Sequence, residues 1–279
     1  MLCPNPTNHN TEWIMPKATR KAAQEMAIVL PRTVLIACPG RQVRSRIRLL
    51  GLAFLVSQAS IAEPLVSGAD LCRASLASAQ ESVPPNSLPS IGPWMLDQSG
   101  TAAHWLGELY DGRKLREPIN LVVIDCVAMS AEAAKDRLVR AALQAGYPIR
   151  VGHSGGYHAV ISGQIYPQIP SGWDEAFSDG VFEVANNHGR IFGPHRSGAA
   201  YIFVGAFSRE EVSPFRWPEH RYASFNTARH DFARKLGLSS EFQPSGYVQL
   251  NNALIDDAGV STGDHDGRAV VIRAGALPN

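Results

Sequence analysis

The chain has 279 residues, of which 45% are hydrophobic and 18% charged, a balance typical of a globular protein with one large or two small domains. Its formal net charge is +1, but eight of the 26 basic residues and only two of the 25 acidic residues lie within residues 1–62. The rest of the chain is therefore mildly acidic. This argues against a nucleic-acid-binding protein, because phosphate contacts need a basic face.

The first 62 residues are interpreted as an extension followed by an export signal. Residues 1–40 contain scattered prolines and are expected to be unstructured, or to reflect a start codon assigned too far upstream. Four arginines at 41–48 then precede the apolar run 49–56, and small residues occupy positions 60 and 62. This order predicts a signal peptide at 41–62, cleaved after Ala62.

The apolar run 49–56 is also shorter than the roughly 20 residues that a membrane-spanning helix needs. We therefore expect a periplasmic or secreted protein that keeps no stable membrane span after removal of the signal. A buried N-terminal helix or a membrane anchor is the alternative.

Residues 63–93 are rich in Ser, Ala and Pro, and they predict a flexible lead-in to one domain at 94–279. Two cysteines, Cys72 and Cys126, remain after removal of the signal. In an oxidising compartment they can form one disulfide, and two buried free thiols are the alternative.

The pattern of residues 94–279 predicts an α+β fold, with a single mixed or antiparallel sheet and a few packed helices. A short helix is expected within 102–115. The apolar run INLVVI at 119–124 predicts a buried strand, and Ser130 is expected to cap a helix at 131–145. Strands at 186–192 and 200–207 follow. A helix at 227–236, capped by Asn226, and a strand pair at 246–250 and 268–273 complete the domain.

Histidines and arginines gather between residues 186 and 236. His188 and Arg190 are two apart on a predicted strand, so they point to one face, where they can bind an anion or combine acid–base chemistry with a positive charge. Ser208 and Arg209 follow the predicted strand at 200–207, a position that often lines a site. A solvated strand face or loop is the alternative for both pairs.

The predicted helix at 227–236 carries Arg229 beside its apolar face. A guanidinium group there needs an acceptor, which is either an internal carboxylate or a bound anion. His220 lies on the approach to this helix. The predicted site thus has two candidate catalytic residues, His188 and His220, and four candidate binding residues, Arg190, Arg229, Ser208 and Arg209.

The order of these motifs resembles the LssY C-terminal domain family over about residues 118–236. In that family a His-x-Arg strand precedes a strand ending in Gly-Ala-Ser/Thr, and a later His precedes a helix that carries Glu-Arg. His188-Gly189-Arg190 resembles the first motif, Gly205-Ala206-Phe207-Ser208 the second, and His220 with Arg229 the third. Asn187 stands where the family tends to have a second His, and the acidic residues before Arg229 are missing. The resemblance implies a bacterial domain and carries no settled activity over to this chain.

A second motif, Gly152-His153-Ser154-Gly155-Gly156, matches the G-x-S-x-G nucleophile elbow of serine hydrolases. The elbow requires a strand before the serine and a helix after it. Asp231 and His265 could complete a triad with Ser154 in the required order. A glycine-rich turn or a ligand-binding loop is the alternative.

The spacing of the histidines matches no metal signature, since His153 and His158 are five apart and His188 and His195 are seven apart. We therefore expect no metal and no cofactor. The expected partner is a small anionic ligand or an envelope component, not a nucleic acid.

Three functions stay open. The first is an exported enzyme, which would be a hydrolase acting on an anionic ligand such as a phosphate-bearing one. The second is a non-catalytic binding module of the cell envelope that uses the same residues. The third is a serine hydrolase built on Ser154.

Overall fold

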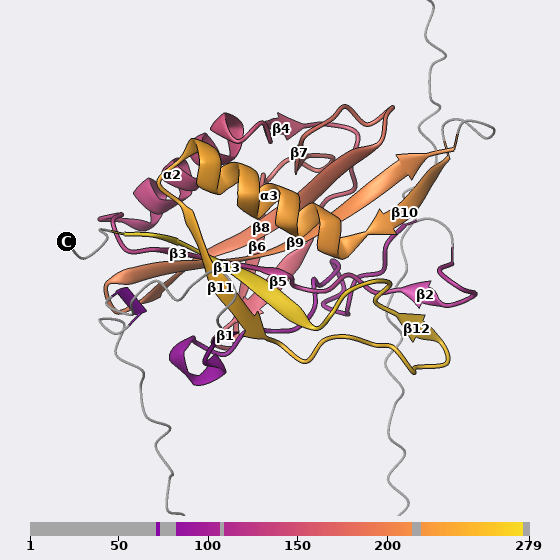
Figure 1. Cartoon of the computed structure of the whole chain (residues 1–279), viewed down its shortest axis with the longest axis horizontal. Helices are drawn as coiled ribbons and strands as arrows, with labels where there is room; N and C mark the ends of the chain where they lie inside the picture. Colours follow the sequence, from indigo (N-terminus) through magenta and orange to yellow (C-terminus); the bar gives the residue numbers. More distant parts are fainter. Residues whose placement is uncertain (1–70, 73–81, 107–108, 214–218, 276–279) are drawn as a thin grey trace, which may run out of the picture. The chain divides into compact units, whose positions relative to one another are not determined.

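The computed structural model describes residues 71–72, 82–106, 109–213 and 219–275. Within these residues an 11-stranded mixed sheet is accompanied by a two-stranded sheet and by helices α2 and α3 (Figure 1). The predicted α+β class is confirmed, and the small second sheet is an addition to it. The predicted extension at 1–40 and the signal peptide at 41–62 lie outside the described residues.

The two longest strands, β8 (Asn186–Ser197) and β9 (Ala200–Val212), form a hairpin within the large sheet. The other strands of this sheet are β1 (Ser82–Val83), β3 (Leu121–Asp125), β4 (Ile149–Arg150), β5 (His158–Ile161), β6 (Gln164–Ile169), β7 (Ala176–Ser178), β10 (His220–Ser224), β11 (Gln243–Gln249) and β13 (Arg268–Ala274). The small sheet pairs β2 (Lys114–Leu115) with β12 (Val260–Ser261). The helical elements are η1 (Pro85–Ser87), α2 (Ala131–Gln144) and α3 (Phe225–Ser239).

Along the large sheet the strand order is β1-β11-β13-β3-β9-β8-β6-β5. Strands β13 and β3 run parallel, as do β1 and β11, and the other pairs in the sheet are antiparallel. β10 extends the sheet beside β9, and β7 pairs with the start of β8. The predicted C-terminal strand pair is confirmed as β11 and β13.

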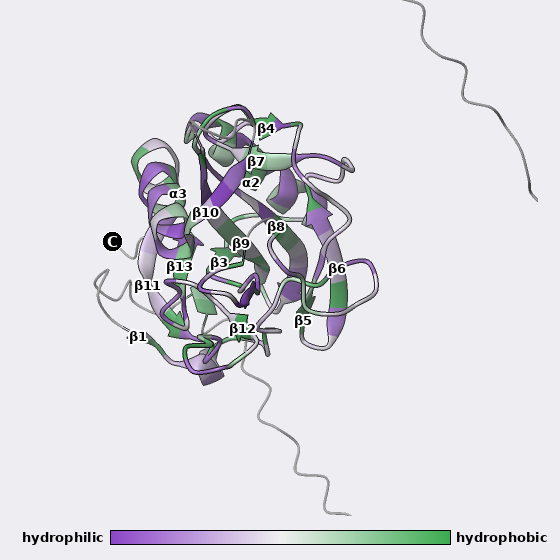
Figure 2. Cartoon of the chain, turned by 90° about the vertical axis from the view of Figure 1, so that its right-hand side faces the viewer, coloured by the Kyte–Doolittle hydropathy of each residue, from purple (hydrophilic) through white to green (hydrophobic). Residues whose placement is uncertain are grey.

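Both faces of the large sheet are buried. Leu121 and Val123 of β3 pack on the side covered by α2 and α3, whereas Val122 and Ile124 face the N-terminal segment. This follows from the period of two along a strand, and it explains why β3 reads as an uninterrupted apolar run. Figure 2 shows hydrophobic residues on the central strands.

Both predicted helices on this sheet are present, with different boundaries in the second case. The Ser130 side chain caps α2 by accepting a hydrogen bond from the backbone N–H of Ala133, as predicted. The cap of α3 is Ser224 rather than Asn226, and the helix continues through Gly237. No helix in the described part of the chain is long and apolar enough to cross a membrane.

The helix predicted within 102–115 is wrong. The described residues there form bridged, extended segments and a turn at 110–113, and the backbone N–H of Trp105 donates to the carbonyl of Leu115 at 2.8 Å. Trp105 and Leu115 instead pack on Phe225 at the start of α3. Tertiary packing of these large side chains outweighs their spacing in the sequence.

The described part of the predicted lead-in at 63–93 is packed against the domain. β1 pairs with β11, and Leu71, Val83 and Leu88 are buried in the core on the side of the sheet opposite the helices. Cys72 forms a disulfide with Cys126, which lies 54 positions further along and directly after β3. The bridge therefore fastens the N-terminal segment to the middle of the sheet.

We expect the double variant Cys72→Ser/Cys126→Ser to lose about 2–4 kcal/mol of unfolding free energy, because the bridge restricts the unfolded chain over a long loop. Urea denaturation of the oxidised protein and of the variant measures the difference. The reduced wild-type protein is the control and should match the variant. Equal stability of the oxidised and reduced wild-type proteins would show that the bridge contributes nothing.

Candidate functional site

An open cavity of about 490 Å³ lies at one end of the β8–β9 hairpin. Its walls come from β8, β9, the start of β10, the turn at 152–154, Phe182, and three residues that precede β3: Trp105, Leu106 and Glu117. Ionisable side chains dominate its polar lining: Glu117, His153, His188, Arg190, Glu210, Glu219 and His220. The volume suits a small molecule.

The pairing of β8 with β9 sets the floor of this cavity. His188 lies opposite Ser208, and Asn186 lies opposite Glu210. Because side chains alternate along a strand, these four residues and Arg190 project from the same face of the sheet. All five are at least 95% buried within the domain.

Gly189 allows the two strands to approach at this point. A Cβ atom at position 189 would lie 2.4 Å from the ring of Phe207, which packs toward the helices. The glycine between His188 and Arg190 thus leaves room for an aromatic core residue on the other face of the sheet. His188 and Arg190 keep their common direction into the cavity.

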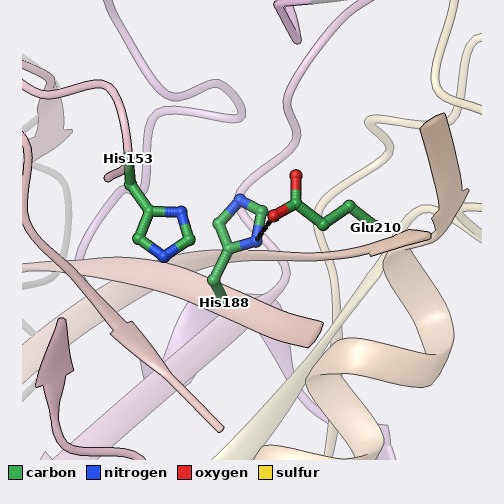
Figure 3. Close-up of side chains that lie close together, drawn as sticks. All are labelled: His153, His188 and Glu210. Carbon is green, nitrogen blue, oxygen red and sulfur yellow. Dashed lines mark ion pairs between the residues drawn. The ribbon is translucent and has the colours of Figure 1, made fainter. Parts of the chain in front are cut away.

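Glu210 lies between two imidazole rings. Its Oε1 atom is 3.7 Å from Nδ1 of His188, and its Oε2 atom is 3.1 Å from Nδ1 of His220 (Figure 3 shows the pair with His188). Asn186 Nδ2 also donates to Oε1 at 2.7 Å. Burial raises the pKa of Glu210, and the hydrogen bond from Asn186 and the nearby His220 oppose that rise.

Asn186 fixes the proton on His188. Its Nδ2 group donates to Glu210, so its Oδ1 atom is the acceptor and lies 3.0 Å from Nδ1 of His188. Nδ1 therefore carries the hydrogen, and Nε2 keeps its lone pair. The hydroxyl of Ser208 lies 3.3 Å from this Nε2 atom.

His153 and His188 stack with their ring centres 4.5 Å apart and their planes at 29°. Figure 3 shows the His153 ring beside that of His188, on the side away from Glu210. Burial lowers the pKa of His153 to about 4 and that of His188 well below its usual value, and the neighbouring imidazoles and Arg190 act in the same direction. Both rings are therefore neutral at pH 7, and two neutral rings can stack without charge repulsion.

His220 stacks on Phe182, with ring centres 4.0 Å apart. Its Nδ1 atom lies 3.1 Å from Oε2 of Glu210, within ion-pair distance. Neither ring nitrogen has a hydrogen-bond partner among the described residues, although both are buried. The stacking on Phe182 and the Glu210 carboxylate beside Nδ1 thus position the His220 ring, and Nε2 is left available.

Arg190 fastens the turn at 152–154 to the strand. Its Nε atom donates to the Ser154 carbonyl at 3.1 Å, its Nη2 atom donates to the same carbonyl, and its guanidinium lies 5.0 Å from the centre of the Tyr157 ring. Burial raises the pKa of Glu117 on the opposite wall, and the positive charge of Arg190 partly offsets this. Arg190 therefore both shapes the cavity and supplies its positive charge.

The structure brings four of the predicted site residues together and separates two others. The cavity is lined by Ser154, His188, Arg190 and His220, and the Ser208 hydroxyl lies 3.3 Å from Nε2 of His188. Arg209 forms an ion pair with Glu211 at 3.7 Å and does not line the cavity. Its position next to Ser208 turns it to the other side of the strand.

Arg229 was predicted to join this site, and that prediction is wrong. Both terminal nitrogens of its buried guanidinium donate to the carboxylate of Asp266 at 2.7 Å, on the helix-covered side of the sheet. The sequence left two acceptors open for Arg229, an internal carboxylate or a bound anion, and the acceptor is the carboxylate of Asp266. A pair of this kind neutralises the buried charge without any ligand, although Nε of Arg229 has no hydrogen-bond partner among the described residues.

The structural context of a nucleophile elbow is also absent. Ser154 follows the two-residue strand β4, and the next regular element is strand β5 rather than a helix. Its hydroxyl accepts a hydrogen bond from Tyr157 at 2.9 Å. The expected triad partners are engaged elsewhere, Asp231 with Lys235 at 2.6 Å and His265 with Asn252 at 2.8 Å. The glycine-rich turn is required by space, because a Cβ at Gly155 would overlap the backbone of Trp173.

Four ionisable residues of the cavity were not predicted as site residues from the sequence: Glu117, His153, Glu210 and Glu219. One atom each from His153, His188 and Glu210 lies within 4.8 Å of the others, so this group could hold a metal ion. Spacing between histidines does not reveal such a group, because a turn and two strands supply one residue each. For Glu210 the signal was present, since extending the strand at 200–207 by three residues places it on the face of Ser208.

No family model, curated protein or solved structure matches this chain. The LssY-like resemblance therefore stays a prediction. The chemistry of the site is inferred from its own geometry.

We expect the folded protein to resist labelling by a fluorophosphonate probe, because no described histidine contacts the Ser154 hydroxyl to activate it. Gel fluorescence after incubation with the probe measures this, with a known serine hydrolase as the positive control. Labelling that disappears in Ser154→Ala would contradict the expectation and support the hypothesis of a serine hydrolase.

Proposed function

We propose that this protein is a hydrolase that uses water, activated in the cavity, to cleave an ester or phosphoester bond of a small substrate. The observation that carries the proposal is the position of Glu210 between His188 and His220 in an open cavity. A carboxylate beside an imidazole orients the ring and stabilises the positive charge that it gains on accepting a proton.

His220 is the residue we assign to proton transfer. It accepts a proton from a water molecule, whose oxygen then bonds to the carbon or phosphorus of the substrate. The bond to the leaving oxygen breaks, and His220 returns the proton to that oxygen, so the net reaction adds one water. The ring is suited to this role because Nδ1 faces the Glu210 carboxylate, whereas Nε2 has no hydrogen-bond partner among the described residues.

Arg190 would stabilise the negative charge that develops on the substrate oxygen. Among the described residues that line the cavity, Arg190 is the one arginine, and no lysine lines it. Arg190 is 2% exposed, so its charge acts in a poorly solvated environment. Two buried carboxyl groups, Glu117 and Glu210, share the cavity with it. A substrate that is polar or carries a single negative charge fits this balance better than a multiply charged one.

We expect His220→Gln to lower kcat by about 10²- to 10⁴-fold on any ester or phosphoester that the wild-type protein cleaves, because the variant loses its proton acceptor. The measurement is a screen of chromogenic carboxylic esters, phosphomonoesters and phosphodiesters, followed by steady-state kinetics on the best substrate. His195→Gln is the matched control, because His195 bonds to Tyr166 outside the cavity and should leave kcat unchanged.

Two outcomes would contradict this proposal. Absence of turnover by folded wild-type protein across the screen would favour the alternative of a binding module that uses the same cavity. An unchanged kcat in His220→Gln, with a normal circular dichroism spectrum, would remove His220 from the mechanism.

We also propose that the protein is exported to the periplasm or secreted. The signal-like order of residues 41–62 supports this, as does the Cys72–Cys126 disulfide, because structural disulfides persist in oxidising compartments. We further propose that the chain belongs to an LssY-like family. The support is that His188, Arg190 and His220, which carry the resemblance, line one cavity.

N-terminal sequencing of the protein isolated from its native host should begin at Glu63, because cleavage is expected after Ala62. The same protein analysed by non-reducing mass spectrometry serves as a control for the bridge. An N-terminus that retains residues 41–62 would contradict cleavage.

A further inference from the structure

We propose that His153, His188 and Glu210 bind one divalent transition-metal ion, and that zinc is the ion their donor set fits best. Two imidazoles and one carboxylate form the ligand set found at catalytic zinc sites that keep a position open for water. Binding of the ion is independent of the hydrolase assignment, whereas its role in catalysis rests on that proposed function.

The ligand atoms are close enough to converge on one ion. One donor from each residue lies within 4.8 Å of the others. Bonds of about 2.0–2.2 Å to a tetrahedral ion separate neighbouring donors by roughly 3.4 Å. Because no two of these donors are more than 4.8 Å apart, each pair must close by at most about 1.4 Å, a movement that rotation of the His153 side chain can supply.

The surroundings hold two of the three ligands in place. The amide of Asn186 accepts from Nδ1 of His188 and donates to Oε1 of Glu210, so one side chain positions both. A carbonyl oxygen that accepts from the second nitrogen of a histidine is the usual support of a metal ligand, since it keeps the proton off the other nitrogen. The Ser208 hydroxyl, 3.3 Å from that nitrogen, would turn away from it when the ion binds. Ser178 and the Val184 carbonyl bond to the same Asn186 amide and fix its orientation.

Buried nitrogen atoms without partners point to the same conclusion. The Nε2 atom of His153 is buried and has no hydrogen-bond partner among the described residues. A buried polar atom left unpaired costs free energy, and a ligand that engages its ring offsets part of that cost. Among the three residues, the His153 ring is therefore the one that no hydrogen bond within the described protein holds beside His188.

The charge balance of the cavity favours a cation. Glu117 and Glu210 are each 4% exposed, and Arg190 is the one lysine or arginine among the described residues that line the cavity. Removing carboxylates from water is costly unless positive charge compensates them. A divalent ion beside Glu210 supplies that charge in the place where the carboxylate is least solvated.

Three protein ligands leave room for one water molecule on the ion, facing the open side of the cavity. His220 lies 3.1 Å from Oε2 of Glu210, so it would stand next to such a water. A zinc ion makes its bound water more acidic, and His220 would be placed to take the proton that this water releases. The inferred ion and the proposed proton acceptor therefore occupy complementary positions.

The test is direct measurement of zinc binding by the full-length, tag-free protein after removal of metal with a chelator. Isothermal titration calorimetry with zinc chloride should show one equivalent bound, and zinc should raise the melting temperature. We expect His153→Gln and Glu210→Gln to weaken binding at least 100-fold, and Asn186→Ala to weaken it by about 10- to 100-fold as a positioning residue.

Matched controls are available on the same strands. His195→Gln removes a histidine of β8 outside the cavity, and Glu211→Gln neutralises the exposed neighbour of Glu210. Both variants should bind zinc like the wild-type protein. Circular dichroism of each metal-free variant shows whether it is folded, and visible absorption of the cobalt-loaded wild-type protein reports the coordination without relying on any variant.

Absence of zinc binding by folded wild-type protein would overturn the inference, as would equal loss of binding in Glu211→Gln and Glu210→Gln. Tighter binding of magnesium than of zinc would also overturn it, because imidazole ligands disfavour magnesium. Zinc binding without turnover would refute the hydrolase and retain the metal site. Turnover that persists unchanged after complete removal of metal would retain the hydrolase and remove the ion from its mechanism.

Discussion

The antiparallel register of β8 and β9 is the constraint on which the rest of the site depends. It sets Asn186 opposite Glu210 and His188 opposite Ser208, so that one amide contacts both a carboxylate and an imidazole. A shift of one residue would turn every one of these side chains toward the helices. The apolar residues that alternate with them, Phe207 among them, oppose such a shift because they would lose the core.

This register places polar groups in the interior at a cost that the neighbouring structure offsets. Asn186 is 1% exposed, yet its amide contacts Ser178, Val184, His188 and Glu210. Each buried group that finds a partner avoids the penalty of an unmet hydrogen bond. His153 and His220 differ, because buried ring nitrogens on both have no such partner among the described residues. Asn186 is thus fixed by hydrogen bonds within the protein, whereas His153 and His220 have nitrogen atoms available to a ligand in the cavity.

Much of the fold could be predicted from local pattern, and part of the site could. The run INLVVI identifies β3, Ser130 identifies the start of α2, and the spacing of His188 and Arg190 identifies their common face. Such features depend on neighbours in the sequence. Contacts between residues far apart in the sequence could not be predicted in this way. His153 stacks on His188 from a turn, and Arg229 pairs with Asp266 instead of lining the cavity. Helix capping also shifted by two residues, because Ser224 has the extended conformation that a cap needs.

The Cys72–Cys126 bridge has a mechanical consequence. A pulling force applied at the N-terminus passes from Cys72 through the sulfur atoms to Cys126, and it bypasses the residues between them. That bypassed loop contains Trp105, Leu106 and Glu117, which form one wall of the cavity. Tension on the N-terminal part of the chain would therefore be carried around this wall rather than through it. This wall is thus relieved of load from that end of the molecule, and the load enters the sheet at the end of β3 instead.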